Sequence, residues 1–154
     1  MAAIFAEGCL ITGEDYANAA QIFQHGTVPA HFYQVYLWAE RGRALGSEEA
    51  ASFIPKSIDR FLLYSGYKQL FASNASGQGG YDDNGEPDGS DPFWCLDPVA
   101  EGVTDAMREA AGAPPLEERI AWVQSLNEGD ESLPVFCDAP ERKEPPKWLF
   151  PGIW

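Results

Sequence analysis

The first apolar pattern in the chain predicts a helix that begins after Thr12 and ends at Gly26. Thr12 can cap the helix, and acidic residues follow in the first turn, where the helix dipole favours negative charge. Apolar residues then recur at helical spacing. The residues that this pattern places on one inward face are Ala19, Ile22 and Phe23. We expect this helix to open a scaffold that extends over about residues 12–66.

Two further helices are predicted within this scaffold. Pro29 suits the first turn of the second helix, because the N–H that proline lacks would have no helical partner there. The apolar stripe of that helix consists of Phe32, Val35, Tyr36 and Ala39, broadened by Trp38 and Leu45. Ser47 can cap the third helix, in which Pro55 introduces a kink or a restart. Together these segments predict two stacked antiparallel helical hairpins.

The pattern changes after residue 66. Residues 68–73 and 92–97 are short apolar runs on either side of a long polar loop, and they predict a β-hairpin over about residues 67–98. Two more helices are expected over about residues 103–129. The tail, 130–154, is rich in proline but ends in several large apolar residues, so we expect it to pack back on the domain or dock on a partner. The expected fold is a mainly α, single domain over residues 1–154.

Charge narrows the functional classes. The chain of 154 residues has a net charge of -14, which opposes binding to nucleic acid or to anionic membranes. Most of it lies after residue 77: residues 1–77 have a net charge of -2 and residues 78–154 a net charge of -12. No run of about 18–20 apolar residues predicts a membrane span. The basic start of a secretory signal is also missing, so we expect a cytoplasmic protein.

The cysteines and the acidic loop give no sign of a metal site. Cys9, Cys95 and Cys137 lack the paired spacing typical of zinc sites or disulfide frameworks. We expect reduced thiols, with a Cys95–Cys137 disulfide as the alternative. The acids over residues 82–91 do not follow the spacing of a calcium-binding EF-hand. We therefore expect no metal and no cofactor.

One segment carries a repeat-like spacing. Within residues 26–50, Val28 is followed by Trp38, Gly46 and Ala50. This spacing resembles one unit of a Sel-type, tetratricopeptide-like repeat, which implies a helical hairpin. No second copy follows, so an array of such repeats is not predicted.

A second set of short motifs is spread over about residues 15–127. In chain order they are Gln24-His25, Asp59-Arg60, Gly66-x-x-Gln69-Leu-Phe71, Asp97-Pro98 and Arg108-x-x-x-Gly112-x-x-Pro115-Leu116. Their order and spacing resemble an uncharacterised, mostly bacterial family of helical domains. That family has Gly-Thr-Gln after the aromatic residue, where this chain has Ala72-Ser73-Asn74. The resemblance implies a helical domain and no established activity.

Four polar residues from these motifs are candidates for catalysis. His25 would act as acid or base, Asp59 would orient it, Arg60 would hold an anionic or carbonyl group, and Gln69 would donate to an oxygen. The alternative is a buried structural network, because ion-pair networks often imitate active sites.

Two functions follow from these observations. The first is a small helical module that binds another protein and neutralises a basic partner, as an immunity protein or antitoxin does. The second is an enzyme (a hydrolase, transferase or cyclase) or a small-molecule binder that uses the four polar candidates. Aromatic residues are expected to supply binding contacts, and these are Trp38, Tyr64, Phe71 and Trp94. The oligomeric state is left open.

Overall fold

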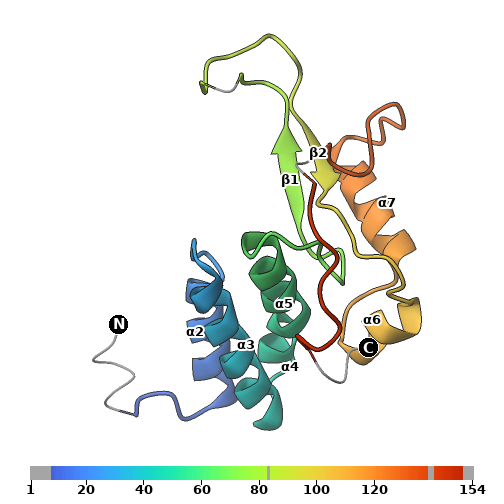
Figure 1. Cartoon of the computed structure of the whole chain (residues 1–154). Helices are drawn as coiled ribbons and strands as arrows, with labels where there is room; N and C mark the ends of the chain where they lie inside the picture. The colour runs from blue at the N-terminus through green and yellow to red at the C-terminus, as the bar shows by residue number, and fades with distance from the viewer. Residues whose placement is uncertain (1–7, 83, 139–140, 151–154) are drawn as a thin grey trace.

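Helices in the first half of the chain form one layer of the molecule. The computed structural model describes residues 8–82, 84–138 and 141–150. Helices α2 (Gly13–Phe23), α3 (Pro29–Ala44) and α5 (Phe53–Tyr64) lie side by side, with the short helix α4 (Glu48–Ala51) before α5 (Figure 1). The predicted third helix is thus two helices that meet at Ser52. The mainly helical character is confirmed, together with a short two-stranded sheet.

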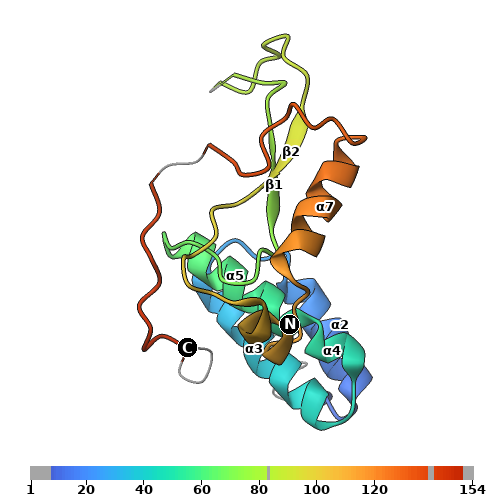
Figure 2. The same ribbon diagram turned by 90° about the vertical axis from the view of Figure 1, so that its right-hand side faces the viewer.

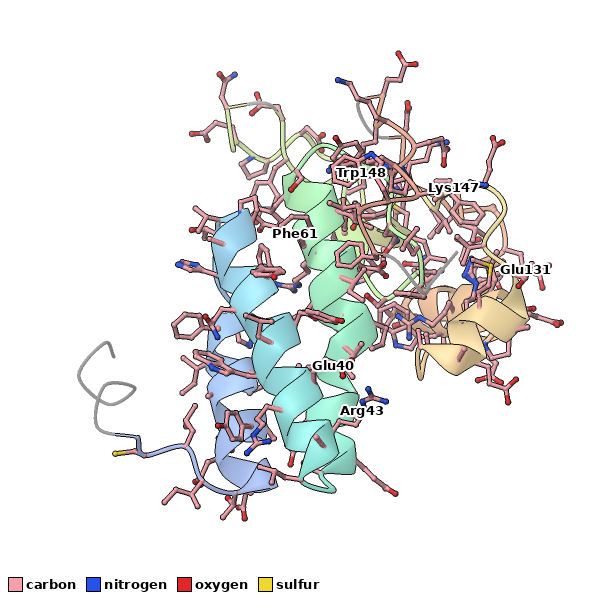
Figure 3. The ribbon with its side chains drawn as sticks, turned by 60° about the horizontal axis from the view of Figure 1, so that its bottom comes forward. Glu40, Arg43, Phe61, Glu131, Lys147 and Trp148 are labelled. Carbon is pink, nitrogen blue, oxygen red and sulfur yellow. A yellow bond between two sulfur atoms is a disulfide. The ribbon has the colours of Figure 1, made fainter. Side chains whose placement is uncertain are left out.

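Small residues allow the first helices to approach closely. Thr12 and Asp15 form the predicted cap of α2. The buried residues of α2 are alanines, and Phe23 packs against the core as predicted. Ile22 is 58% exposed, so its predicted inward position is wrong. Gly42 of α3 shows how tight the packing is, because a Cβ atom there would lie 2.4 Å from the Cβ of Ala50. The side chains of Glu40 and Arg43 come from the same end of α3 (Figure 3).

Two apolar clusters hold the layers together. The larger one joins α3 and α5 to the segment that follows α5, and it is built from Val35, Ala39, Ile54, Ile58, Leu62, Leu70 and Phe71, among others. The smaller one lies under α7 and contains Ala72, Leu96 and Val123. Because residues 70–72 contribute to both clusters, this segment connects the helical layer to the rest of the molecule.

The hairpin forms within its predicted range, and its second strand lies where it was predicted, but its first strand is displaced. Strands β1 (Ala75–Gln78) and β2 (Phe93–Leu96) pair antiparallel, and the loop between them extends away from the helices (Figures 1 and 2). The prediction of a strand over residues 68–73 is wrong. The backbone N–H groups of Leu70, Phe71 and Ser73 turn toward a buried carboxylate instead, so they are not available to a sheet partner.

Two helices follow the hairpin as expected. Thr104 caps α6 (Asp105–Ala110), and α7 (Leu116–Leu126) packs against β2. None of the helices in the described ranges is both long and apolar enough to cross a membrane.

The tail packs against the domain in two places, as predicted for its described residues. Near its start, the N–H of Leu96 donates to the carbonyl of Val135 at 2.8 Å, which places the tail beside β2. Further on, the N–H of Lys68 donates to the carbonyl of Lys143 at 2.9 Å. Leu149 then packs against the larger cluster, and Figure 2 shows the tail running along the molecule.

A disulfide joins Cys95 of β2 to Cys137 of the tail, with Cα atoms 5.0 Å apart. The expectation that these two thiols are reduced is therefore wrong. Spacing along the sequence could not show that the tail lies beside β2. Stable disulfides are typical of oxidising compartments, so a cytoplasmic location does not follow from the cysteines. Cys9 is a free, exposed thiol.

Candidate functional site

Asp59 organises the turn that follows α5. Its carboxylate is fully buried and accepts hydrogen bonds from the backbone N–H groups of Leu70 (2.7 Å), Phe71 (3.0 Å) and Ser73 (2.9 Å). Burial raises the pKa of Asp59, and the N–H groups of Ser73 and Phe71 oppose that rise. Both carboxylate oxygens are thus occupied by the backbone that they fix in place. We call Asp59, Gln69 and residues 70–74 the sealed turn.

The sealed turn forces one residue into a left-handed conformation. Ala72 has φ 55°, a region that favours glycine. An alanine costs about 1–2 kcal/mol there relative to an unstrained backbone. The guanidinium of Arg119 donates to the carbonyl of Ala72 at 2.8 Å and helps to hold it.

Gln69 closes the same turn with its side chain. Its amide oxygen accepts from the N–H of Asn74 at 3.0 Å, and its amide nitrogen donates to the carbonyls of Asn74 (3.0 Å) and Asp97 (2.7 Å). The side chain is fully buried. Gln69 therefore links the turn to the end of β2, and these bonds leave its amide little capacity for a substrate.

His25 does not meet the other predicted catalytic residues. Its ring is exposed, and its Nε2 lies 3.2 Å from the side-chain nitrogen of Gln21. In the described part of the chain, no hydrogen bond joins His25 to Asp59 or Gln69. The predicted arrangement, in which Asp59 orients His25, has no counterpart in these contacts. Asp59 and Gln69 instead bond to backbone groups of the sealed turn and of Asp97.

Arg60, next to Asp59, points to a different region. Its Nη1 donates to the carbonyl of Gln24 at 2.6 Å, and its Nε donates to Oδ1 of Asn74 at 3.1 Å. Its guanidinium also lies 5.9 Å from the centre of the Phe32 ring. These contacts fix the orientation of the guanidinium, which borders a cleft.

This cleft lies where the end of α5, the start of β1, the end of β2 and the tail come together (Figure 1). Its volume is about 350 Å³. The residues that line it are Arg60, Leu63, Tyr64, Asn74, Ala75, Ser76, Asp97 and Arg142. We call it the arginine cleft, because two guanidinium groups from distant parts of the chain border it.

Arg142 is the contribution of the tail to the arginine cleft. Its Nη1 donates to the carbonyl of Leu63 at 2.5 Å. Its Nε is buried and has no hydrogen-bond partner within the described residues. A buried donor without a partner costs about 1–3 kcal/mol.

A carboxylate and a hydroxyl complete the polar wall of the arginine cleft. The hydroxyl of Ser76 lies 3.1 Å and 3.0 Å from the two oxygens of Asp97, to which it donates. Burial raises the pKa of Asp97, while the Ser76 hydroxyl and the charges of Arg142 and Arg60 act in the opposite direction. The arginine cleft thus holds two cations and one acid.

The predicted binding aromatics fall into two groups. Phe71 is fully buried, and Trp38 is only 9% exposed and packs edge-on against Phe23 at 4.7 Å. These two residues belong to the interior and offer little surface to a partner. Tyr64 and Trp94 are 51% and 45% exposed. Tyr64 lines the arginine cleft, whereas Trp94 lines a separate groove beside α7.

Sequence reasoning missed Asn74, Ser76 and Arg142. Arg142 lies in a proline-rich segment without periodicity, so nothing local marks it as a site residue. The signal that could have found it is the pairing of Cys95 with Cys137, which brings the tail to β2. Ser76 lies in what was predicted to be a loop, and its position became meaningful only with the hairpin register.

No family model, curated protein or solved structure matches this chain. Within the described ranges, no group of three or more His, Cys, Asp or Glu side chains is placed to hold a metal ion.

Proposed function

We propose that the protein binds a small anionic molecule, with a carboxylate or phosphate group, in the arginine cleft. The observation that carries this proposal is that Arg60 and Arg142 border one cleft and that both have N–H donors without a partner among the described residues. Each guanidinium has five N–H groups. Within the described residues, Arg60 uses its Nε and Nη1, and Arg142 uses only its Nη1.

The arrangement favours an anion for energetic reasons. Hydrogen bonds from a guanidinium to a carboxylate or phosphate are charge-assisted and about twice as strong as neutral ones. Arg60 is already oriented by Gln24 and Asn74, so little side-chain entropy is lost on binding. The net charge of -14 does not oppose a small anion strongly, because exposed charges are screened beyond about 8 Å at physiological salt.

The proposal concerns binding, because His25 is not among the residues that line the arginine cleft. Asp97 and Ser76 would lie beside a bound anion and are the groups from which any chemistry would start. The predicted alternative of a small-molecule binder thus moves to a new set of residues, of which Arg60 alone was predicted as catalytic.

Titration with anions tests this function. Inorganic phosphate, citrate and short carboxylates are added to the full chain, and binding is followed by calorimetry and thermal shift. We expect at least one anion to bind and Arg142→Gln to weaken it tenfold or more, since one bidentate charge-assisted contact is lost. Arg43→Gln is the matched control, because Arg43 pairs with Glu40 on α3, outside the arginine cleft. Equal affinity in both variants would contradict the proposal.

A second candidate function rests on the groove beside α7. This groove has a volume of about 620 Å³, and Trp94, Leu126 and Leu133 line it together with the acids Glu128 and Asp130. Exposed apolar residues among acids fit a basic partner with apolar side chains, which agrees with the excess of acid after residue 77.

A defined basic peptide tests the second function. We expect an amphipathic peptide rich in lysine and leucine to bind at low salt and to lose affinity in Trp94→Ala. Trp148→Ala is the control, because Trp148 is 75% exposed and does not line the groove. Binding that is equal in both variants would show that charge alone attracts the peptide.

A further inference from the structure

The charges of the arginine cleft are separated rather than paired. Asp97 borders the same cleft as Arg60 and Arg142, yet no ion pair within 4.0 Å joins it to either among the described residues. A ligand with only negative charge would be attracted by the guanidinium groups and repelled by the carboxylate. A ligand that carries both a negative and a positive group can pair with the guanidinium groups and with the carboxylate at once.

Asp97 has unused capacity for a cation. A carboxylate offers about four lone-pair sites, and the one proton of the Ser76 hydroxyl occupies at most one of them. No other hydrogen bond to the Asp97 side chain exists in the described part of the chain. The carboxylate is also largely removed from water, since Asp97 is 8% exposed. An ammonium group beside it would have three donors to offer.

The size and the apolar lining of the arginine cleft suit a compact molecule. The volume of about 350 Å³ is near the lower end of the usual range for ligand sites, about 300–1,000 Å³. Leu63 and Tyr64 border the arginine cleft with apolar surface, and the Tyr64 ring is held against Phe32 at 4.8 Å. One apolar group of a small ligand could pack against these two residues.

We infer that the ligand of the arginine cleft is a zwitterion of the amino-acid class, with its carboxylate on Arg60 and Arg142 and its ammonium on Asp97. This inference rests on the proposed function and narrows it to one class of molecule. Asp97 is then a positioning and specificity residue, and it selects against anions without an amine.

The experiment compares pairs of ligands that differ only in the amine. The twenty standard L-amino acids are screened by thermal shift on the full chain, and those that bind are titrated beside their desamino analogues. We expect an amino acid to bind at least tenfold more tightly than its desamino analogue. In Asp97→Asn this preference should vanish, whereas in the control Asp91→Asn, in the exposed loop, it should persist. Thermal unfolding of each variant confirms that it is folded.

Each other outcome is informative. If a carboxylate binds as tightly as its amino acid, or if the preference survives in Asp97→Asn, the zwitterion inference is overturned and anion binding stands. If carboxylates or phosphate bind and no amino acid does, the result is the same. If neither amino acids nor anions bind, the proposed function fails and the inference fails with it.

Discussion

Asp59 and Arg60 are neighbours on α5 and belong to two very different polar regions. Asp59 enters the sealed turn, where backbone N–H groups occupy both carboxylate oxygens. Arg60 enters the arginine cleft, where guanidinium donors are left over. The residue types alone do not distinguish these roles. The distinction comes from counting which hydrogen-bonding groups are already used.

The two buried acids show the same difference. Burial raises the pKa of Asp59 and of Asp97. Asp59 has its charge shared among three N–H groups of a turn that it holds together. Asp97 has a single hydroxyl partner and two guanidinium groups in the same cleft. A buried acid that supports the backbone thus has its hydrogen-bond acceptors filled by its own chain. A buried acid in a binding site keeps acceptor positions that a ligand can fill.

The largest effect is expected from Asp59→Ala. Removal of the carboxylate leaves the N–H groups of Leu70, Phe71 and Ser73 without their acceptor. We expect the free energy of unfolding to fall by about 3–5 kcal/mol, because several buried donors lose their partner together. Urea denaturation measures it, with the exposed Asp91→Ala as the control. A loss below about 1 kcal/mol would mean that water reaches the turn.

Removal of the disulfide should disturb the arginine cleft and leave the sealed turn intact. We expect Cys95→Ser with Cys137→Ser to lower the free energy of unfolding by about 2–4 kcal/mol. Anion affinity should also fall, because Arg142 lies in the tail that this bond holds to β2. Cys9→Ser is the control, since Cys9 is a free, exposed thiol. Unchanged affinity in the double variant would show that the backbone hydrogen bonds of the tail, to Leu96 and to Lys68, hold it in place without the disulfide.

A smaller loss is expected from Gln69→Ala. The side chain makes three hydrogen bonds, to Asn74 twice and to the carbonyl of Asp97. We expect thermal or chemical unfolding to show a loss of about 2–3 kcal/mol. The exposed Gln21→Ala should change stability by less than about 0.5 kcal/mol. Equal effects of the two changes would argue that Gln69 has no structural role.

The smallest effect is a change of stability with pH at Asp97. Because its pKa is raised on folding, its contribution to stability is fully present below the unfolded pKa and is lost as pH rises through the folded pKa. Asp97→Asn cannot lose a proton there. We therefore expect the stability of the variant, relative to the natural chain, to improve from pH 3.5 to pH 7, measured by denaturation at each pH. A constant difference would show that the pKa of Asp97 is not raised.

The helices could be predicted from the sequence because they depend on local signals. Thr12 and Ser47 cap helices as predicted, and the stripe of α3 is buried at Phe32, Val35 and Ala39. The conformation of residues 68–73 could not be predicted, because it depends on a carboxylate from α5. A strand and a turn around a distant side chain have the same apolar pattern.

The residues of the site could be predicted only in part. Arg60 and Tyr64 were among the predicted residues, and both border the arginine cleft. Asp59 and Gln69 were predicted as well, but their hydrogen bonds point inward, which no spacing reveals. Arg142 depends on a contact between the tail and β2 that only the fold shows.

The most direct test of the arginine cleft as a binding site follows the arginine side chains themselves. The Nε–H signals of the full chain are recorded by NMR during titration with the anion or amino acid that binds best. We predict that the signals of Arg60 and Arg142 shift with one shared affinity, while those of Arg41, Arg43, Arg108 and Arg119 stay in place. Shifts confined to those four arginines, with Arg60 and Arg142 unmoved, would contradict the assignment of the arginine cleft as the binding site.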